Sequence, residues 1–176
     1  MSASGMPQIG KPEIEIYDVE IENVTIRAAG PADHAFIRAQ APRLTDIAHL
    51  PGRPKAAIEA FQQALIEAAL TNPPAGSRTL IACITPEKPL GFVHLEPAQD
   101  PLAQAPAGYV SMLSVATGAE GYGIGRLLME AAEAWAREQG FTCLSLDVFA
   151  SNTHGRAFYA RQGFHEDSLK LYKLLD

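Results

Sequence analysis

Apolar residues recur along this chain with two different periods, and the period separates predicted strands from predicted helices. Alternating patterns and short apolar runs predict strands over residues 24–29, 78–85, 90–96, 109–116 and 142–149, with one or two more over 164–175. Helical spacing predicts helices over about 31–40, 54–71, 124–139 and 153–162. Residues 43–53 and 97–108 follow neither pattern, so we predict a polar loop and a long connection there.

The same spacing predicts which side chains are buried. In the helix that begins near Pro54, the predicted buried stripe is Ile58, Phe61, Leu65 and Ala68. The apolar face of the helix that Gly140 terminates is Ile124, Leu127, Leu128, Ala131, Ala132 and Trp135. Asp33 is the predicted N-cap of the first helix, because a short carboxylate can accept a hydrogen bond from a first-turn backbone N–H.

A glycine-rich segment joins the strand at 109–116 to the next helix. Gly121, Gly123 and Gly125 permit positive φ and a close approach of the backbone to a ligand. Backbone N–H groups that converge at a helix N-terminus form an anion site; the alternative is a tight turn that needs glycine only for packing. Gly125 comes one residue early for a Rossmann fingerprint, and Arg126 follows it where a Walker A loop needs lysine.

A second block of residues, downstream of the glycine segment, makes the pattern specific. This block contains Asn152, Phe158, Tyr159, Gly163 and Phe164. Together the two blocks resemble the GNAT superfamily of acyl-CoA-dependent N-acyltransferases, over about residues 24 to 176. The family loop is usually [Q/R]-x-x-G-x-[G/A]; the departures from the two family patterns are Glu120 at the Gln/Arg position and Gly155 in place of an alanine.

The resemblance implies an α/β (α+β) GNAT fold, a mixed and mostly antiparallel twisted sheet with helices on both faces. It implies that acetyl-CoA donates an acetyl group to a primary amine of an unidentified acceptor by direct attack, without a metal. The residues implied to bind the cofactor are Leu113, Ser114, Val115, Glu120, Gly121, Tyr122, Gly123, Ile124, Gly125, Arg126, Asn152 and Tyr159. Asn152 would contact the pantetheine arm or cap its helix.

The implied catalytic residues are Tyr159, Glu96 and His94. The tyrosine matching Tyr159 protonates the departing thiolate in many family members, and the alternative is a tyrosine that only fills the core. A base is needed because an alkyl ammonium has a pKa of about 10. The family often has a glutamate where this chain has Ser111; His94 and Glu96 share one face of the neighbouring strand, although each could also be purely structural.

Glu120 would present a carboxylate to the cofactor phosphates. We expect its side chain to turn outward, or a nearby cation such as Arg126 or Arg156 to offset its charge. Glu120 and Ser111 also favour an alternative function, a catalytically inactive CoA-binding regulatory module, whereas Tyr159 disfavours it.

Composition limits the remaining classes of function. The chain has 176 residues and a formal net charge of −6 without a dense basic cluster, which argues against nucleic acid and anionic membranes and favours a cationic amine. Cys83 and Cys143 lie in apolar runs and are predicted to be buried thiols, and the histidines lack metal-site spacing. No signal peptide or membrane span is evident, so we expect a soluble cytoplasmic protein.

The domain organisation is predicted as one GNAT domain over residues 23–176, preceded by an extension over residues 1–22. Residues 1–12 have no periodicity and are expected to form a mobile tail. Residues 13–21 alternate acidic and apolar side chains, which predicts an added edge strand or an arm onto a partner subunit. This segment and the family resemblance are both compatible with a homodimer.

Overall fold

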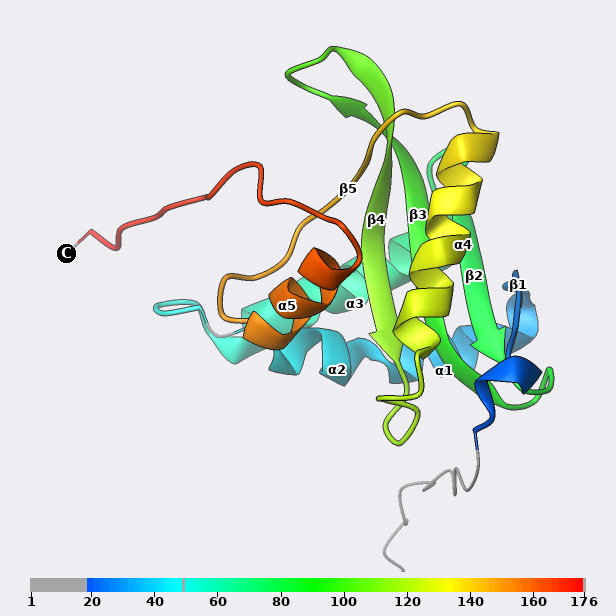
Figure 1. The fold of residues 1–176 in the computed structure, drawn as a ribbon. Coiled ribbons are helices and arrows are strands. Elements are labelled where there is room, and N and C mark those ends of the chain that lie inside the picture. Colours follow the sequence, from blue (N-terminus) through cyan, green and yellow to red (C-terminus); the bar gives the residue numbers. More distant parts are fainter. Residues whose placement is uncertain (1–18, 49, 176) are drawn as a thin grey trace, which may run out of the picture.

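A computed structural model describes residues 19–48 and 50–175 and contains one five-stranded sheet (Figure 1). The strands follow the order β1 (Thr25–Ala28), β2 (Arg78–Cys83), β3 (Pro89–Asp100), β4 (Ala105–Val115) and β5 (Leu144–Leu146). The first three neighbouring pairs are antiparallel, and β4 and β5 are parallel. The expected mixed, mostly antiparallel sheet is therefore confirmed.

Helices cover both faces of this sheet. Figure 1 shows α4 (Ile124–Glu138) on one face, and α1 (His34–Ala39), α2 (Ala41–Asp46) and α3 (Lys55–Thr71) on the other. Two apolar clusters lie between the sheet and these helices. One contains Leu128, Met129 and Trp135 of α4, and the other contains Ile37 of α1 and Ile66 of α3. Helix α5 (Thr153–Arg161) follows β5, and short 3-10 turns occupy Ile21–Asn23 and Pro31–Asp33. None of the described helices is long and apolar enough to cross a bilayer.

The connection predicted over residues 97–108 is wrong, because β3 and β4 continue through it as a long hairpin. Their pairing runs out to Asp100 and Ala105, and the hairpin extends past the rest of the sheet in Figure 1. The Asp100 carboxylate closes the turn by accepting hydrogen bonds from the N–H groups of Leu102 and Ala103, at 2.8 and 2.9 Å. Backbone pairing and this side-chain turn hold the hairpin without the alternating apolar pattern that predicts strands.

Two expectations about the helices opposite α4 also need correction. Phe61 is 58% exposed and Ala68 is exposed, whereas the buried face of α3 is Ile58, Gln62 and Ile66. This face follows one row of residues four apart, whereas the predicted stripe alternated spacings of three and four residues. The predicted loop over 43–53 begins as helix, because α2 extends to Asp46.

Asp33 does not cap α1 with its side chain. Its carboxylate accepts two hydrogen bonds from the Arg27 guanidinium, both at 2.7 Å, and one from the Gly30 N–H at 2.8 Å. The Arg27 guanidinium lowers the pKa of the buried Asp33 carboxyl below its usual value. The acid therefore joins β1 to the turn before α1 instead of serving the helix terminus.

The chain ends depart from the predicted strands. Residues 164–175, predicted as one or two strands, form no strand in the described structure, and Leu169, Leu171 and Leu175 are exposed. The Tyr172 hydroxyl instead donates to the Pro51 carbonyl at 2.8 Å. At the other end, Ile21–Asn23 form a 3-10 turn, and residues 13–18 of the predicted added strand lie outside the described residues.

The two cysteines differ. Cys83 is buried, as predicted. Cys143 is exposed, because the strand predicted over 142–149 pairs only through Leu144–Leu146 and leaves Cys143 before the ladder.

Candidate functional site

Strand β4 separates from β5 at a bulge. His94 of β3 pairs with Met112, but the next residue of β3, Leu95, pairs with Val110, so Ser111 is an extra residue in β4. A bulge bends its strand and increases the local twist. The ladder between β4 and β5 ends at Val110, where the bulge begins, while β4 continues to Val115. Figure 1 shows the chain after β5 running away from β4 toward α5.

Alternation along β4 decides which backbone groups face this opening. The Ala116 N–H donates to the Leu90 carbonyl of β3 at 2.7 Å, so Ala116 faces β3. Successive residues of a strand direct their N–H and C=O groups to opposite sides. Ser114 therefore also faces β3, and its carbonyl oxygen would lie 2.7 Å from a Cβ added at Gly91. Leu113 and Val115 direct their backbone groups to the open side.

The glycine segment after β4 has the backbone that an anion site needs. Gly118, Gly121 and Gly123 have φ values of +86°, +82° and +80°. Gly123 is the N-cap of α4 and makes no side-chain capping bond. The first N–H groups of a helix lack intrahelical partners, and the helix dipole adds positive potential there. The loop thus presents free donors at the end of the open strand.

Gly125 does not adopt the positive φ predicted for it. A Cβ at this position would lie 3.2 Å from Cζ of Phe158, which is closer than ordinary van der Waals contact. Gly125 therefore lets α5 pack against the first turn of α4. Gly118, which lies outside the family motif, is the additional glycine with positive φ.

Arg43 of α2 offsets the charge of Glu120. Its Nη2 donates to the Glu120 carboxylate, and its Nη1 donates to the Thr117 hydroxyl at 2.7 Å. The two cations expected for this role have other partners: Arg126 pairs with Glu130 at 3.3 Å, and Arg156 pairs with Glu166. A cation thus offsets the charge as expected, but it is neither of the two named arginines, because Arg43 and Glu120 are 77 residues apart and no local pattern connects them.

Tyr159 lies in α5 with its ring between two aromatic neighbours. The ring centroids of Phe158 and Phe164 are 5.1 and 5.9 Å away, both in edge-to-face geometry. Burial raises the pKa of Tyr159 to about 12, so the phenol stays protonated at neutral pH. Its hydroxyl makes no hydrogen bond to another of the described residues, which leaves it available to a ligand.

Asn152 caps α5, which is one of its two predicted roles. Its Oδ1 accepts a hydrogen bond from the Gly155 N–H at 2.8 Å. A Cβ at position 155 would collide with the Asn152 amide group. Glycine at this position, where the family pattern has alanine, therefore leaves room for the Asn152 cap, which a larger residue would displace.

His94 and Glu96 lie side by side on the face of the sheet that α3 covers. His94 is 1% exposed; its Nδ1 is 2.7 Å from the Thr79 hydroxyl, and its Nε2 is 3.3 Å from Glu96 Oε1 without a hydrogen bond. Burial lowers the pKa of His94, and the nearby Glu96 carboxylate only partly opposes this. His94 is thus neutral at pH 7, while the Glu96 side chain is 28% exposed.

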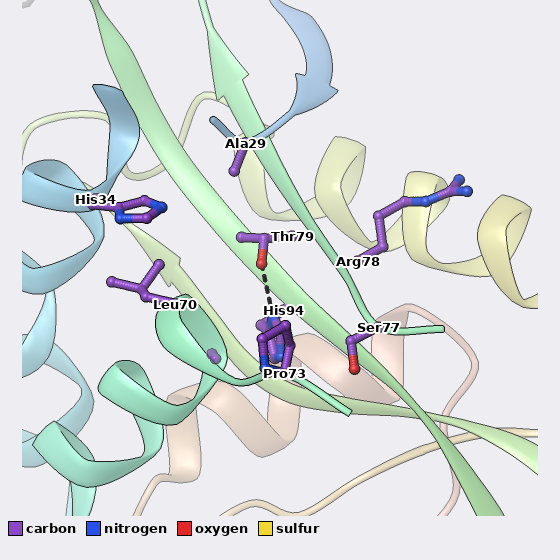
Figure 2. Close-up of a pocket in the computed structure, with 9 residues that line it drawn as sticks. Ala29, His34, Leu70, Pro73, Ser77, Arg78, Thr79 and His94 are labelled. Carbon is purple, nitrogen blue, oxygen red and sulfur yellow. Dashed lines mark hydrogen bonds between the residues drawn. The ribbon is translucent and has the colours of Figure 1, made fainter. Parts of the chain in front are cut away.

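Figure 2 shows His94 and Thr79 at a cavity of about 160 Å³ between the sheet and the end of α3. His34, Leu70 and Pro73 also line it. The two nitrogens of His94 therefore have different surroundings. One is beside the Thr79 hydroxyl at the cavity, and the other is beside the Glu96 carboxylate.

Sequence reasoning missed two residues next to Glu96. Tyr109 is the direct partner of Glu96 across the β3–β4 ladder, and its hydroxyl donates to Asp147 Oδ2 at 2.9 Å. Burial and the Asp147 carboxylate both raise the pKa of Tyr109 well above its usual value. Asp147 directly follows β5, so these groups lie where β4 and β5 separate. Only the register of the strands places Tyr109 beside Glu96, with Asp147 bonded to its hydroxyl.

Comparison with known proteins supports one family. The model of the acetyltransferase (GNAT) family matches residues 42–164. A mycothiol acetyltransferase from Jonesia denitrificans is 40% identical over 75 residues, a segment that is 43% of this chain and 23% of that protein. The match thus spans less than a quarter of that relative.

Solved structures show the same fold. A putative acetyl transferase from Pyrococcus furiosus aligns with a TM-score of 0.71 at 22% identity, over 86% of this chain and 99% of that one. The structure of AAC(6')-Iy in complex with the bisubstrate analog CoA-S-monomethyl-acetylneamine aligns with a TM-score of 0.60 at 18% identity, over 87% of this chain and 99% of that one. At these identities the likeness concerns the fold alone.

Proposed function

The chain belongs to the acetyltransferase (GNAT) family, and from this premise we propose that it transfers an acetyl group from acetyl-CoA to a primary amine by direct attack on the thioester. One observation carries the proposal. The free edge of β4 leads directly into a loop of glycines with positive φ and an uncapped helix N-terminus. An extended arm that ends in phosphates fits such an arrangement, because the strand edge offers backbone pairing and the helix offers anion-binding donors.

The cofactor contacts follow from the direction of each backbone group. The N–H groups from Gly121 to Arg126 would bind the pyrophosphate, with Tyr122, Gly123, Ile124 and Gly125 between them. Leu113 and Val115 would pair with the pantetheine arm, because their backbone groups face the open side of β4. Ser114 would contribute only by holding the strand, since its hydroxyl pairs with Gln40 Oε1 at 3.2 Å. One outward N–H would stabilise the oxyanion, an effect of about 3 kcal/mol per donor.

Tyr159 would serve as the acid. Its hydroxyl would donate a hydrogen bond to the thioester sulfur as the carbon–sulfur bond breaks, which would stabilise CoA as it departs as a thiolate. Support comes from the buried, protonated phenol and from the absence of a competing bond with the described residues. The edge-to-face packing with Phe158 and Phe164 would fix the ring, as an acid with a defined geometry requires.

Glu96 would accept the proton that the amine loses, directly or through water, and His94 would position it. This division of roles rests on exposure: His94 is 1% exposed and cannot touch an acceptor, whereas Glu96 is partly exposed. With Nε2 protonated, neutral His94 would direct an N–H toward the carboxylate. Ser111, at the position of the family's usual glutamate, would then not be needed as a base.

The acceptor would be a cationic amine. Glu96 and Asp147 flank Tyr109 at the point where the strands separate, and neither pairs with a described lysine or arginine. Two carboxylates raise the local concentration of a cation. The family match leaves the acceptor open, because the matched proteins differ in their named substrates.

An acetylation assay across amine classes tests the proposal. The protein would be mixed with acetyl-CoA and, in turn, a diamine, an aminoglycoside, an amino acid and a peptide N-terminus, and thiol release and acetylated product would be measured. We expect product with at least one cationic amine, and a lower kcat/KM for Asp147→Asn with that amine but not with an uncharged one. Binding of acetyl-CoA without product from any amine would support the inactive regulatory module instead.

A further inference from the structure

We propose that Arg43 of α2 is the cation that binds the cofactor phosphates in this chain, held at the glycine loop by Glu120 and Thr117. The inference rests on the proposed position of the phosphates. It assigns the role to a residue that lies outside the loop and far from it in the sequence.

The charges of the loop create the need for such a cation. The loop and first turn of α4 contain one acid, Glu120, and one base, Arg126. Arg126 is engaged with Glu130 one helical turn away, at 3.3 Å. Without Arg43, an approaching phosphate would therefore meet an uncompensated carboxylate beside the backbone donors.

The geometry of Arg43 meets this need. A guanidinium has five N–H donors and no acceptor. The bonds to Thr117 and Glu120 use one donor on each terminal nitrogen, so each terminal nitrogen keeps a second N–H. The Arg43 side chain is 31% exposed, so a ligand can reach it. Arginine binds phosphate through two parallel hydrogen bonds, which suits donors that are free on both terminal nitrogens.

The backbone that carries Arg43 is held in place. Leu44 and Thr45 of α2 are buried, and Gln40, the residue before α2, bonds to Ser114 of the cofactor strand at 3.2 Å. Arg43 thus comes from a helix attached to β4 itself. Because the Arg43 backbone is already ordered, binding a phosphate loses less conformational entropy than it would with an arginine on a mobile segment.

Calorimetry with acetyl-CoA tests the inference, with acetyl-pantetheine as a donor that lacks the pyrophosphate. We expect Arg43→Gln to weaken acetyl-CoA binding by about 10- to 100-fold, the range for a charge-assisted hydrogen bond, and to leave kcat/KM for acetyl-pantetheine within about twofold. We expect Arg43→Gln with Glu120→Gln to recover part of the loss, because the unpaired carboxylate is gone. Arg38→Gln, which breaks the exposed pair between Arg38 of α1 and Glu67 of α3, is the matched control and should not change binding.

The outcomes separate this inference from the proposed function. If the unaltered protein does not bind acetyl-CoA, the proposed cofactor site is wrong. If it binds and Arg43→Gln binds equally well, Arg43 has no phosphate role. An equal loss with acetyl-CoA and acetyl-pantetheine would mean that Arg43 only supports the fold, and it would overturn the inference.

Discussion

The hydroxyl of Tyr159 gives the sharpest test of the proposed chemistry. Tyr159→Phe removes one oxygen and keeps the ring that packs between Phe158 and Phe164. Because no described residue bonds to this hydroxyl, we expect the free energy of unfolding to change by no more than about 1 kcal/mol. Any large effect on turnover must then come from the missing hydroxyl.

The raised pKa of Tyr159 sets the size of that effect. An alkyl thiol has a pKa of about 8.5, taking cysteine as the reference, whereas the pKa of Tyr159 is raised to about 12. Full proton transfer to a finished thiolate would therefore be uphill by about 5 kcal/mol, at 1.36 kcal/mol per pKa unit. Tyr159 would act instead by donating a charge-assisted hydrogen bond as the bond breaks, an effect of about 1.5–3 kcal/mol. We expect kcat to fall by about 10- to 100-fold, near the lower end of the usual range for acid–base groups.

Steady-state release of CoA at pH 7.5 measures this directly. The KM for acetyl-CoA should stay within about twofold, because the hydroxyl acts mainly in the transition state. Since Tyr159 stays protonated to about pH 12, the unaltered protein should show no loss of kcat from this group between pH 7 and 10. Tyr172→Phe is the control, because its hydroxyl bonds to the Pro51 carbonyl and has no proposed part in the reaction, and it should leave kcat unchanged. An unchanged kcat in Tyr159→Phe would refute the assignment.

Three further predictions follow from the site and its surroundings. Glu96→Gln should lower kcat/KM by about 10²-fold or more, and a variant that keeps its kcat/KM would move the base elsewhere. Gly121→Ala and Gly140→Ala each place a Cβ at positive φ with no atom within 4 Å, and each should lower the free energy of unfolding by about 1–2 kcal/mol. Only Gly121→Ala should also weaken acetyl-CoA binding, and equal binding by the two variants would contradict the phosphate loop. Because burial lowers the pKa of His94, the unfolded chain binds a proton there first, so stability should fall as the pH drops from about 6.5 through the folded pKa. The Tm of His94→Gln should depend less on pH over that window than the Tm of His154→Gln, and equal slopes would contradict the buried, neutral state.

Local patterns alone predicted the elements whose own side chains decide their structure. The helix at α4 was predicted closely because Ile124, Leu128, Ala132 and Trp135 of its predicted apolar face are buried and Gly140 ends it with a φ of +74°, although the buried face also includes Met129 and Ala136 in place of the half-buried Leu127 and Ala131. Gly121 and Gly123 were identified because a strand-to-helix turn of this length needs positive φ, which glycine adopts without strain. The two motif blocks predicted the family, and the family model confirmed it.

Tertiary structure decided what depends on neighbours distant in the sequence. The bulge at Ser111, the pairing of Tyr109 with Glu96, and the Arg43–Glu120 pair all arise from strand register or from helix packing. Likewise, the alternation over residues 164–175 could not produce a strand, because a strand needs a partner edge as well as a pattern. The sequence thus determined the local elements and the family, whereas the contacts among those elements determined which charges and donors meet at the site.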